Sequence, residues 1–339
     1  MNIEMEADRM PNCCLNKIEI KYETEQLQFH PITLDVKPLI DSYTKPWMLE
    51  CSDLSFANLY IWGANGKMEY AERNNVLYIK LDFKGVPVFL WAPIPKFGIE
   101  VDYRKAVYDG IRYMKEIGTE PTYRSVWTPF RDKILEACPE LFSTPTDIAW
   151  DYVYSRESLA TLKGKKLHGK RNHINKFLAN YPDYEYRPLN KSMIDDCIAL
   201  YDHWISEKDE DTSDTMNNER QSVVLALNHM DELGLTGGTI YIDNKLCAFT
   251  VGERLHPHMQ LIHIEKGDTN YEGIFPMINQ QYILHECQDV ELINREEDMG
   301  VEGMRKAKRS YQPIKMIEKH LISIKEISEL KGIWGHDDE

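Results

Sequence analysis

The sequence predicts an α+β fold built from two tandem modules, each with a mixed sheet flanked by helices. Two observations carry this prediction: a meander of three strand-like runs occurs once in each half of the chain, and each meander is followed by helix, strand, helix and strand. The hairpins YIKLDFKGVPVFLWAPIP and YIDNKLCAFTVGERL also correspond between the halves. We therefore place one domain at residues 1–160 and the second at residues 161–339.

Size and composition agree with a globular chain. The protein has 339 residues, of which 42% are apolar and 11% aromatic, which is enough for two cores. The longest apolar run, 86–94, contains two prolines and is too short to span a bilayer, so we expect no integral membrane span. The N-terminus lacks the pattern of a secretory signal, and the seven cysteines show no paired spacing. We expect a cytoplasmic protein with reduced core thiols.

The first half begins with a strand-to-helix entry at 32–42 and an aromatic, partly buried segment at 55–63. Three strands follow at 66–71, 75–82 and 85–92, with hairpin turns at Asn74–Asn75 and Lys84–Gly85. A helix over 102–117 buries one apolar side, Val107, Ile111 and Met114. The strand TYRSVW, a short helix over 129–137 and the strand AWDYVYS complete this half.

The second half has helices over 191–207 and 217–233, joined by an acidic loop at Glu207–Asp214, which we interpret as a solvated connector. Three strands and a turn at Asp243–Asn244 follow, then a helix over 273–285. A strand at 290–293, a helix that opens near Gly300 and a closing strand over 314–324 finish the module.

The helix near Gly300 has an amphipathic pattern. Val301, Met304, Ala307 and Tyr311 recur at the helical period and predict a buried face, whereas the opposite face carries Arg305, Lys306, Lys308 and Arg309. Asp298 precedes the helix and is placed to cap its first N–H groups. Two interpretations stay open: a capped helix with a solvated charged face, or an anion-binding helix beside a carboxylate cluster that forms an active-site wall.

Charge is distributed unevenly along the chain. The formal net charge of −15 excludes a protein that coats nucleic acid over its whole surface, yet the run KGKKLHGKRNHINK (163–176) is densely basic. On a helix this run would present several cations to one partner while Ile174 and Phe177 anchor it. A basic, solvated linker is the alternative interpretation.

Three segments carry a family resemblance: DYVYSRESLATLKGKKLHGKRNHINKF, HIEKGDTNYEGIFPMINQQYI and NREEDMGVEGMRKAKRSYQP. They resemble the DUF2156 family, which is related to the C-terminal catalytic domain of phosphatidylglycerol lysyltransferases. The resemblance implies two tandem GNAT-like modules, as in the FemABX peptidyltransferases that take amino acids from aminoacyl-tRNA. The larger lipid-modifying relatives carry an N-terminal bundle of transmembrane helices that this sequence does not show, so the resemblance implies a transferase core more directly than a lipid acceptor.

The resemblance also directs the choice of site residues. Deprotonation of a nucleophile and stabilisation of an oxyanion assist aminoacyl transfer, and Glu296, Glu297, Asp298, His263 and Glu265 could serve the first role and Arg305 or Lys306 the second. We favour Asp298, Arg305 and Glu296 as catalytic residues, since they lie in the most specific motif. The partner would be the acceptor end of an aminoacyl-tRNA or a phosphorylated small molecule. We expect substrate or phosphate to be bound by Lys166, Lys170, Arg171, His173, Lys306, Lys308, Arg309 and Asn279. For Asn279 and His173, a packing or hydrogen-bonding role is the alternative.

Coenzyme A is a disfavoured cofactor. A CoA-binding loop needs a glycine-rich turn whose N–H groups converge on the pyrophosphate, whereas the matching segment EKGDTNYEGIFPM contains Asp268 and Glu272. We also predict no metal site, because the histidines lack ligand spacing apart from His256 and His258 around a proline.

Three functions remain open at this stage: an aminoacyl-tRNA-dependent transferase that acts on a lipid, peptide or small amine, a CoA-dependent N-acyltransferase, and a non-catalytic phosphate-ligand module. The donor, the acceptor and the oligomeric state have no signal in the sequence.

Overall fold

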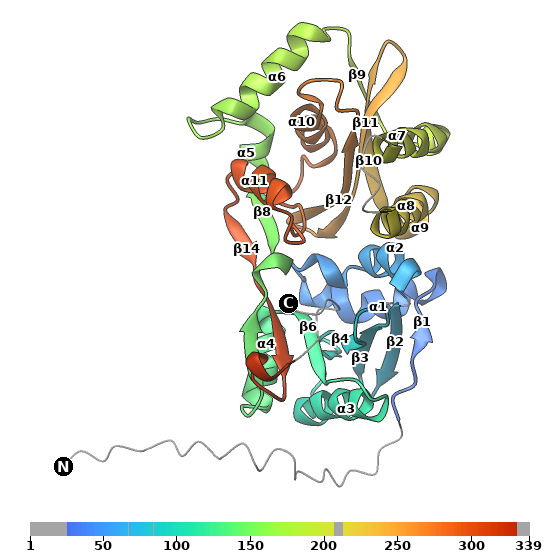
Figure 1. Cartoon of the computed structure of the whole chain (residues 1–339), viewed down its shortest axis with the longest axis vertical. Helices are drawn as coiled ribbons and strands as arrows, with labels where there is room; N and C mark the ends of the chain where they lie inside the picture. Colours follow the sequence, from blue (N-terminus) through green and yellow to red (C-terminus); the bar gives the residue numbers. More distant parts are fainter. Residues whose placement is uncertain (1–25, 67, 84, 207–212, 331–339) are drawn as a thin grey trace, which may run out of the picture.

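The computed structural model describes residues 26–66, 68–83, 85–206 and 213–330, which form two stacked modules (Figure 1). The first contains an eight-stranded sheet in the order β1-β2-β3-β4-β6-β15-β7, with β5 paired to β3. Its strands are β1 (His30–Pro31), β2 (Met68–Arg73), β3 (Val76–Leu81), β4 (Phe89–Leu90), β5 (Ile94–Pro95), β6 (Thr122–Trp127), β7 (Phe142–Pro145) and β15 (Lys319–Ser323). Its helices are η2 (Leu34–Val36), α1 (Lys37–Thr44), η3 (Lys45–Trp47), η4 (Ser52–Leu54), α2 (Phe56–Gly66), α3 (Tyr103–Glu116), α4 (Thr128–Ala137) and η5 (Asp147–Ala149).

The second module contains a seven-stranded sheet in the order β14-β8-β13-β12-β11-β10-β9. Its strands are β8 (Asp151–Ser155), β9 (Glu185–Pro188), β10 (Leu235–Ile242), β11 (Lys245–His256), β12 (Met259–Gly267), β13 (Leu292–Asn294) and β14 (Lys315–Ile317). Its helices are α5 (Arg156–Thr161), α6 (His168–Asn180), η6 (Lys191–Met193), α7 (Ile194–Ser206), α8 (Ser213–Asn228), α9 (Met230–Leu233), α10 (Ile274–Glu286) and α11 (Glu302–Ser310), and η8 (Ile327–Glu329) follows β15. The predicted α+β fold with two mixed sheets is confirmed.

Local signals placed most elements correctly. Helix α3 begins after Asp102, whose side chain accepts a hydrogen bond from the Lys105 N–H, and it buries Val107, Ile111 and Met114 as predicted. Asn74–Asn75 and Asp243–Asn244 both have positive φ angles, as a two-residue hairpin turn between twisted strands requires. The acidic connector predicted at 207–214 lies largely outside the described residues, as do Cys13 and Cys14. The five described cysteines are buried and unpaired, which confirms their role as core thiols.

The closing strand predicted over 314–324 is instead two strands that belong to different sheets. Strand β14 pairs with β8 in the second sheet, and β15, one residue later, lies between β6 and β7 in the first. Figure 1 shows this red segment crossing from the upper module to the lower one beside the green β8. The boundary at residues 160 and 161 stays a prediction, but the sheets do not follow it: β8 precedes it and lies in the second sheet, and β15 follows it and lies in the first.

The modules also share a hydrophobic core. One cluster of buried side chains runs from the first sheet and α2 to α7 and α8 of the second module, and includes Phe56, Tyr201, Leu227 and Phe249.

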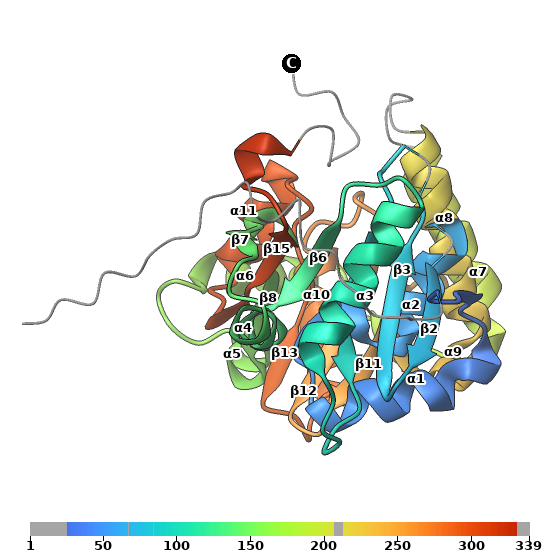
Figure 2. The same ribbon diagram turned by 90° about the horizontal axis from the view of Figure 1, so that it is seen from below.

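Viewed from below, α3 and α4 lie across the near end of the molecule (Figure 2). Among the described helices none is long and apolar enough to cross a membrane.

Candidate functional site

Each sheet contains one place where two parallel strands separate. In the second sheet, β12 and β13 pair through Met259–Leu292, Gln260–Ile293 and Leu261–Asn294 only. Strand β13 then ends, while β12 continues to Gly267 with no parallel neighbour. We call this place the strand fork. It is defined by His263 and Glu265 on β12 and by the loop 295–300 that follows β13.

An arginine and a glutamate form the centre of the strand fork. Arg295 Nη2 donates to Glu265 Oε1 over 2.9 Å, and Asn279 of α10 donates to Glu265 Oε2 over 2.8 Å. The guanidinium lies 4.8 Å from the ring centroid of Tyr311 and 5.8 Å from that of Tyr154. Arg295 Nη1 is buried and has no hydrogen-bond partner among the described residues. A buried donor without an acceptor is costly, so this atom is available to a water molecule or to a substrate group.

Lys170 joins the basic run to the strand fork. Its Nζ lies 4.0 Å above the ring of Tyr311, and it makes no hydrogen bond or ion pair with a described residue. Burial and the charge of Arg295 lower its pKa, although Glu265 opposes this shift. Arg295 and Lys170 are therefore two cations that both act on the Glu265 carboxylate, and Lys170 also feels the charge of Arg295.

A buried imidazole, that of His263, lies between two glutamates of the strand fork and of β11. His263 Nδ1 is 2.9 Å from Glu296 Oε1, and its Nε2 is 3.1 Å from Glu253 Oε1. Burial alone would lower the pKa of His263, but the hydrogen bonds and charges of Glu253 and Glu296 raise it to about 10. At neutral pH His263 is thus an imidazolium, and Glu296 is one of its two counterions.

Asp298 is buried and accepts four hydrogen bonds. Its Oδ2 accepts from the Tyr152 hydroxyl (2.6 Å) and from Arg305 Nε (2.8 Å), and its Oδ1 accepts from Arg305 Nη2 (3.1 Å) and from the Gly300 N–H (2.9 Å). Burial opposes ionisation, but these donors lower the pKa of Asp298 to about 2. The predicted cap is shifted: Asp298 closes the turn before α11, and Val301 is the N-cap residue.

The predicted orientation of α11 is wrong. Val301 and Met304 are 50% and 37% exposed, and only Tyr311, just after the helix, is buried. The inward side carries Arg305 and Lys308 instead. Lys308 Nζ donates to the Arg295 carbonyl over 2.5 Å and also to the Glu297 carbonyl. Because the loop presents a buried carboxylate and two carbonyl oxygens to α11, the cationic side satisfies them better than an apolar side could.

A second charged cluster lies where the chain crosses between the sheets. Fully buried Lys319 donates to Asp151 Oδ1 over 2.7 Å, pairs with Asp53 and lies 3.9 Å from Glu297 Oε2. Asn294 Nδ2 donates to the other oxygen of Asp151 over 3.0 Å. Burial raises the pKa of Glu297 to about 7. The charge of Lys319 opposes this rise, and the negative charges of Glu296, Asp53 and Asp151 add to it. Glu297 is therefore a carboxyl group that titrates near neutral pH.

Some of the residues predicted to bind phosphate have exposed side chains, and others already make hydrogen bonds within the protein. Lys166, His173, Lys306 and Arg309 are exposed on α6, α11 and the loop before α6. Arg171 is engaged, since it donates to the carbonyls of Leu162 and Gly164 and closes that loop. Lys308 and Asn279 are engaged as described above. Their role in substrate binding stays a prediction.

The segment that would face CoA is occupied by protein groups. Asp268 is buried and accepts from the N–H and side-chain amide of Asn270 and from Lys245. A Cβ at Gly273, which has a φ angle of 89° and precedes α10, would lie 2.5 Å from the His173 carbonyl oxygen. Carboxylate and carbonyl oxygens thus surround the start of α10, which is unfavourable for a pyrophosphate. The absence of a CoA cofactor stays a prediction.

Sequence reasoning did not select Arg295, Asp151 or Lys319. The signal available for the last two was a lone charge within an apolar strand, AWDYVYS and KHLIS, which is typical of a buried ion pair. For Arg295 the only available signal was its position directly after β13, because its partner Glu265 lies 30 residues away in the sequence.

Two mixed sheets, each with one forked parallel pair, define a class of α+β proteins built from two GNAT-like modules. Within that class the chain belongs to the family whose model is described as phosphatidylglycerol lysyltransferase, C-terminal, which matches residues 48–323.

Solved structures agree with this assignment. A conserved protein of unknown function from Bacteroides thetaiotaomicron is 33% identical, with a TM-score of 0.81 over 88% of this chain and all of that one. The C-terminal domain of a putative lysylphosphatidylglycerol synthetase from Agrobacterium fabrum is 12% identical, with a TM-score of 0.59 over 87% of this chain and 92% of that one. L-PGS from Bacillus licheniformis is 13% identical, with a TM-score of 0.58 over 85% and 94%. The last two likenesses concern the fold.

A curated relative, an uncharacterised protein of Mycoplasmoides gallisepticum, is 25% identical over 176 residues, which are 51% of this chain and 56% of the relative. The match thus spans little more than half of that protein.

Proposed function

We propose that this protein transfers an aminoacyl group from aminoacyl-tRNA to an amine or hydroxyl acceptor at the strand fork. The observation that carries the proposal is the buried Arg295 Nη1 without a partner, beside the equally unpaired ammonium of Lys170. Family membership supports the reaction class, because the family is described by a lysyltransferase domain.

The strand fork suits the charge that develops in acyl transfer. An amine or hydroxyl adds to the ester carbonyl, so the carbonyl oxygen gains negative charge before the ester C–O bond to the tRNA ribose breaks. Arg295 Nη1 and Lys170 Nζ are positive donors in a desolvated setting, where they stabilise an oxyanion more than they would in water. Glu265 and Asn279 hold the guanidinium in place, so little reorganisation is needed.

The proton of the attacking group needs an acceptor. Asp298, with a pKa of about 2 and four donors, is a weak base, and His263 is already protonated at neutral pH. Glu297 lies two residues after Arg295 in the same loop, on the side of Lys319, and its pKa of about 7 is the affinity that a general base requires near neutrality. We assign it the proton from the nucleophile, which then passes to the ribose oxygen as that group leaves.

The carrier would lie along α6 and α11. Lys166 and Lys306 are exposed, and Lys170 of the same basic run reaches the strand fork, so cations lead from the surface to the proposed reaction site. Because charged tRNA is a cytoplasmic pool and the described cysteines are unpaired, we place the reaction in the cytoplasm.

The test is single-turnover transfer with tRNA charged with each radiolabelled amino acid, and with anionic vesicles, peptides and polyamines as acceptors. We expect one charged tRNA to be deacylated with label in one acceptor class, and Arg295→Lys and Lys170→Gln to lower the rate at least about 100-fold. Binding of charged tRNA should weaken at least about tenfold in Lys166→Glu and again in Lys166→Glu/Lys306→Glu, whereas Lys115→Glu, a single reversal at an exposed residue of α3, should leave it unchanged. Equal binding by all three proteins, or no transfer from any charged tRNA, would exclude the proposal.

A further inference from the structure

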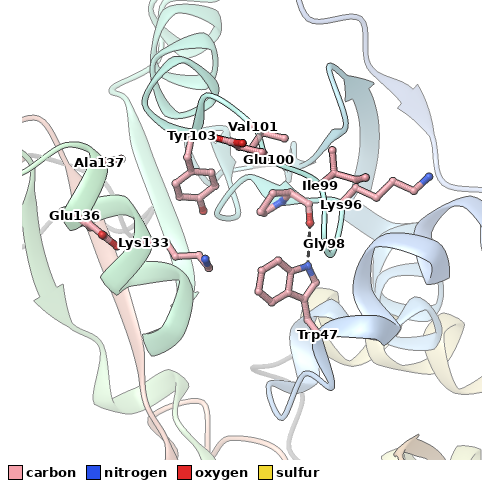
Figure 3. Close-up of a pocket in the computed structure, with 11 residues that line it drawn as sticks. Trp47, Lys96, Gly98, Ile99, Glu100, Val101, Tyr103, Lys133, Glu136 and Ala137 are labelled. Carbon is pink, nitrogen blue, oxygen red and sulfur yellow. Dashed lines mark hydrogen bonds between the residues drawn. The ribbon is translucent and has the colours of Figure 1, made fainter.

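The first module has a pocket that the proposed reaction does not use (Figure 3). Its volume is about 430 Å³, within the range of small-molecule sites. It lies beyond the end of β5, between the loop that leads to α3, the second half of α4, and Trp47 of η3. Elsewhere in the first sheet, β4 pairs with parallel β6 at Leu90–Tyr123, and β5 pairs with β3.

Two aromatic walls of the pocket are held in fixed orientations. Trp47 Nε1 donates to the Pro95 carbonyl over 2.9 Å, and the Tyr103 hydroxyl donates to the Pro93 carbonyl over 2.8 Å. Phe97 and Phe130 meet the indole edge to face, with centroids 5.1 Å and 5.5 Å away. A ligand would therefore meet preformed aromatic surfaces, which lowers the entropic cost of binding.

One cation faces this aromatic surface without a counterion. Lys133 Nζ lies 5.1 Å from the ring centroid of Trp47 and makes no hydrogen bond or ion pair with a described residue. Lys96 also lines the pocket, but its Nζ lies over Tyr43, 5.2 Å from that ring, and Figure 3 shows it pointing away from Lys133. The acidic liners, Glu100 and Glu136, are exposed, so water rather than the pocket solvates them.

We propose that this pocket binds a small carboxylic acid with an aromatic or apolar body, whose carboxylate pairs with Lys133 while its body packs on Trp47, Val101 and Ala137. A single ammonium matches a singly charged acid. A phosphate dianion would need more donors than the one ammonium that the pocket offers. An organic cation would be repelled by Lys133, although Glu100 and Glu136 would attract it from the rim.

The experiment is calorimetric titration of the full chain with three probes of nearly equal shape: phenylacetate, neutral phenylacetamide and cationic 2-phenylethylamine. We expect phenylacetate to bind at least about tenfold more tightly than either of the others, since it alone supplies the counterion. Lys133→Gln should remove this preference and leave phenylacetamide binding unchanged. Its melting temperature should match the wild type, because the structure gives Lys133 no hydrogen bond.

Glu136→Gln is the matched control, since it removes an opposite charge one turn further along α4 and should leave phenylacetate binding equal or tighter. Trp47→Leu should weaken phenylacetate and phenylacetamide alike. Tighter binding of 2-phenylethylamine than of phenylacetate, binding of phenylacetate that survives Lys133→Gln, or no binding of any probe would overturn the proposal.

Discussion

At the scale of single residues, His263 and Glu297 respond to pH in different windows. The pKa of His263 is raised to about 10 by its two glutamates against the effect of burial, whereas burial raises the pKa of Glu297 to about 7. Both folded forms hold a proton more tightly than the unfolded chain does, so both groups favour folding at low pH. The contribution of Glu297 is lost between about pH 4.5 and 7, and that of His263 between about pH 6.5 and 10.

We predict that His263→Gln lowers the free energy of unfolding by about 3 kcal/mol at pH 6, because it leaves Glu253 and Glu296 without the cation between them. The difference from the wild type should shrink as the pH approaches 10. Urea unfolding at a series of pH values measures this directly. A constant difference across that range would show that His263 is not held as an imidazolium.

For Glu297→Gln we predict a higher free energy of unfolding than that of the wild type at alkaline pH. At pH 8 the wild type carries an ionised, partly buried carboxylate, so the variant should unfold at a higher urea concentration, and at pH 4.5 the two should be alike. If transfer activity is established, its rate in the wild type should rise through about pH 7 and the variant should lack this rise. A rise that persists in Glu297→Gln would assign the base to another group.

The contribution of Asp298 to stability can be tested by removing its charge at a single pH. Asp298→Asn keeps the size of the side chain but removes the charge that pairs with Arg305, so we expect a loss of about 3 kcal/mol in stability. Glu302→Gln, an exposed acidic residue at the start of α11, is the control and should change stability by less than about 0.5 kcal/mol. Equal effects of the two substitutions would show that the Asp298 hydrogen bonds contribute little.

At the scale of elements, α11 shows where sequence periodicity misleads. Its apolar residues recur at the helical period, yet the side that faces the protein carries Arg305 and Lys308. We predict that Val301→Ser changes stability by less than about 0.5 kcal/mol, whereas Tyr311→Ala costs about 3–5 kcal/mol because a buried ring is removed. Thermal unfolding of both variants measures this. A large loss in Val301→Ser would restore the orientation predicted from the sequence.

The elements themselves were largely predictable, because strand alternation, helix caps and turn residues are local signals. The orientation of α11 was not, since it depends on Asp298 being buried and on the carbonyls of the 295–297 loop. The assignment of β15 to the first sheet was not predictable either, because a pairing between Lys319 and Trp127 leaves no local trace. For the same reason the pair between Arg295, in the loop after β13, and Glu265 of β12 could not be predicted, whereas Lys170 could be chosen from its basic run.

At the scale of the whole molecule, the two sheets are mutually dependent. Strand β15 is inserted between β6 and β7, and β8 is inserted between β13 and β14. We predict that a fragment of residues 26–160 does not unfold cooperatively on its own, because its sheet lacks an interior strand. Coexpression with residues 161–339 should restore a single transition in circular dichroism. A cooperative transition for the isolated fragment would show that its sheet closes without β15.

This exchange of strands also determines when the first sheet can be completed during synthesis. The ribosome completes β7 at Pro145, but the strand that must pair with β6 and β7 ends at Ser323, a further 178 residues later. At typical translation rates this interval lasts about 10–35 s, during which two strand edges stay unpaired on the nascent chain. Until β15 emerges, we expect the first half of the protein to present β6 and β7 as edges that can pair with another chain.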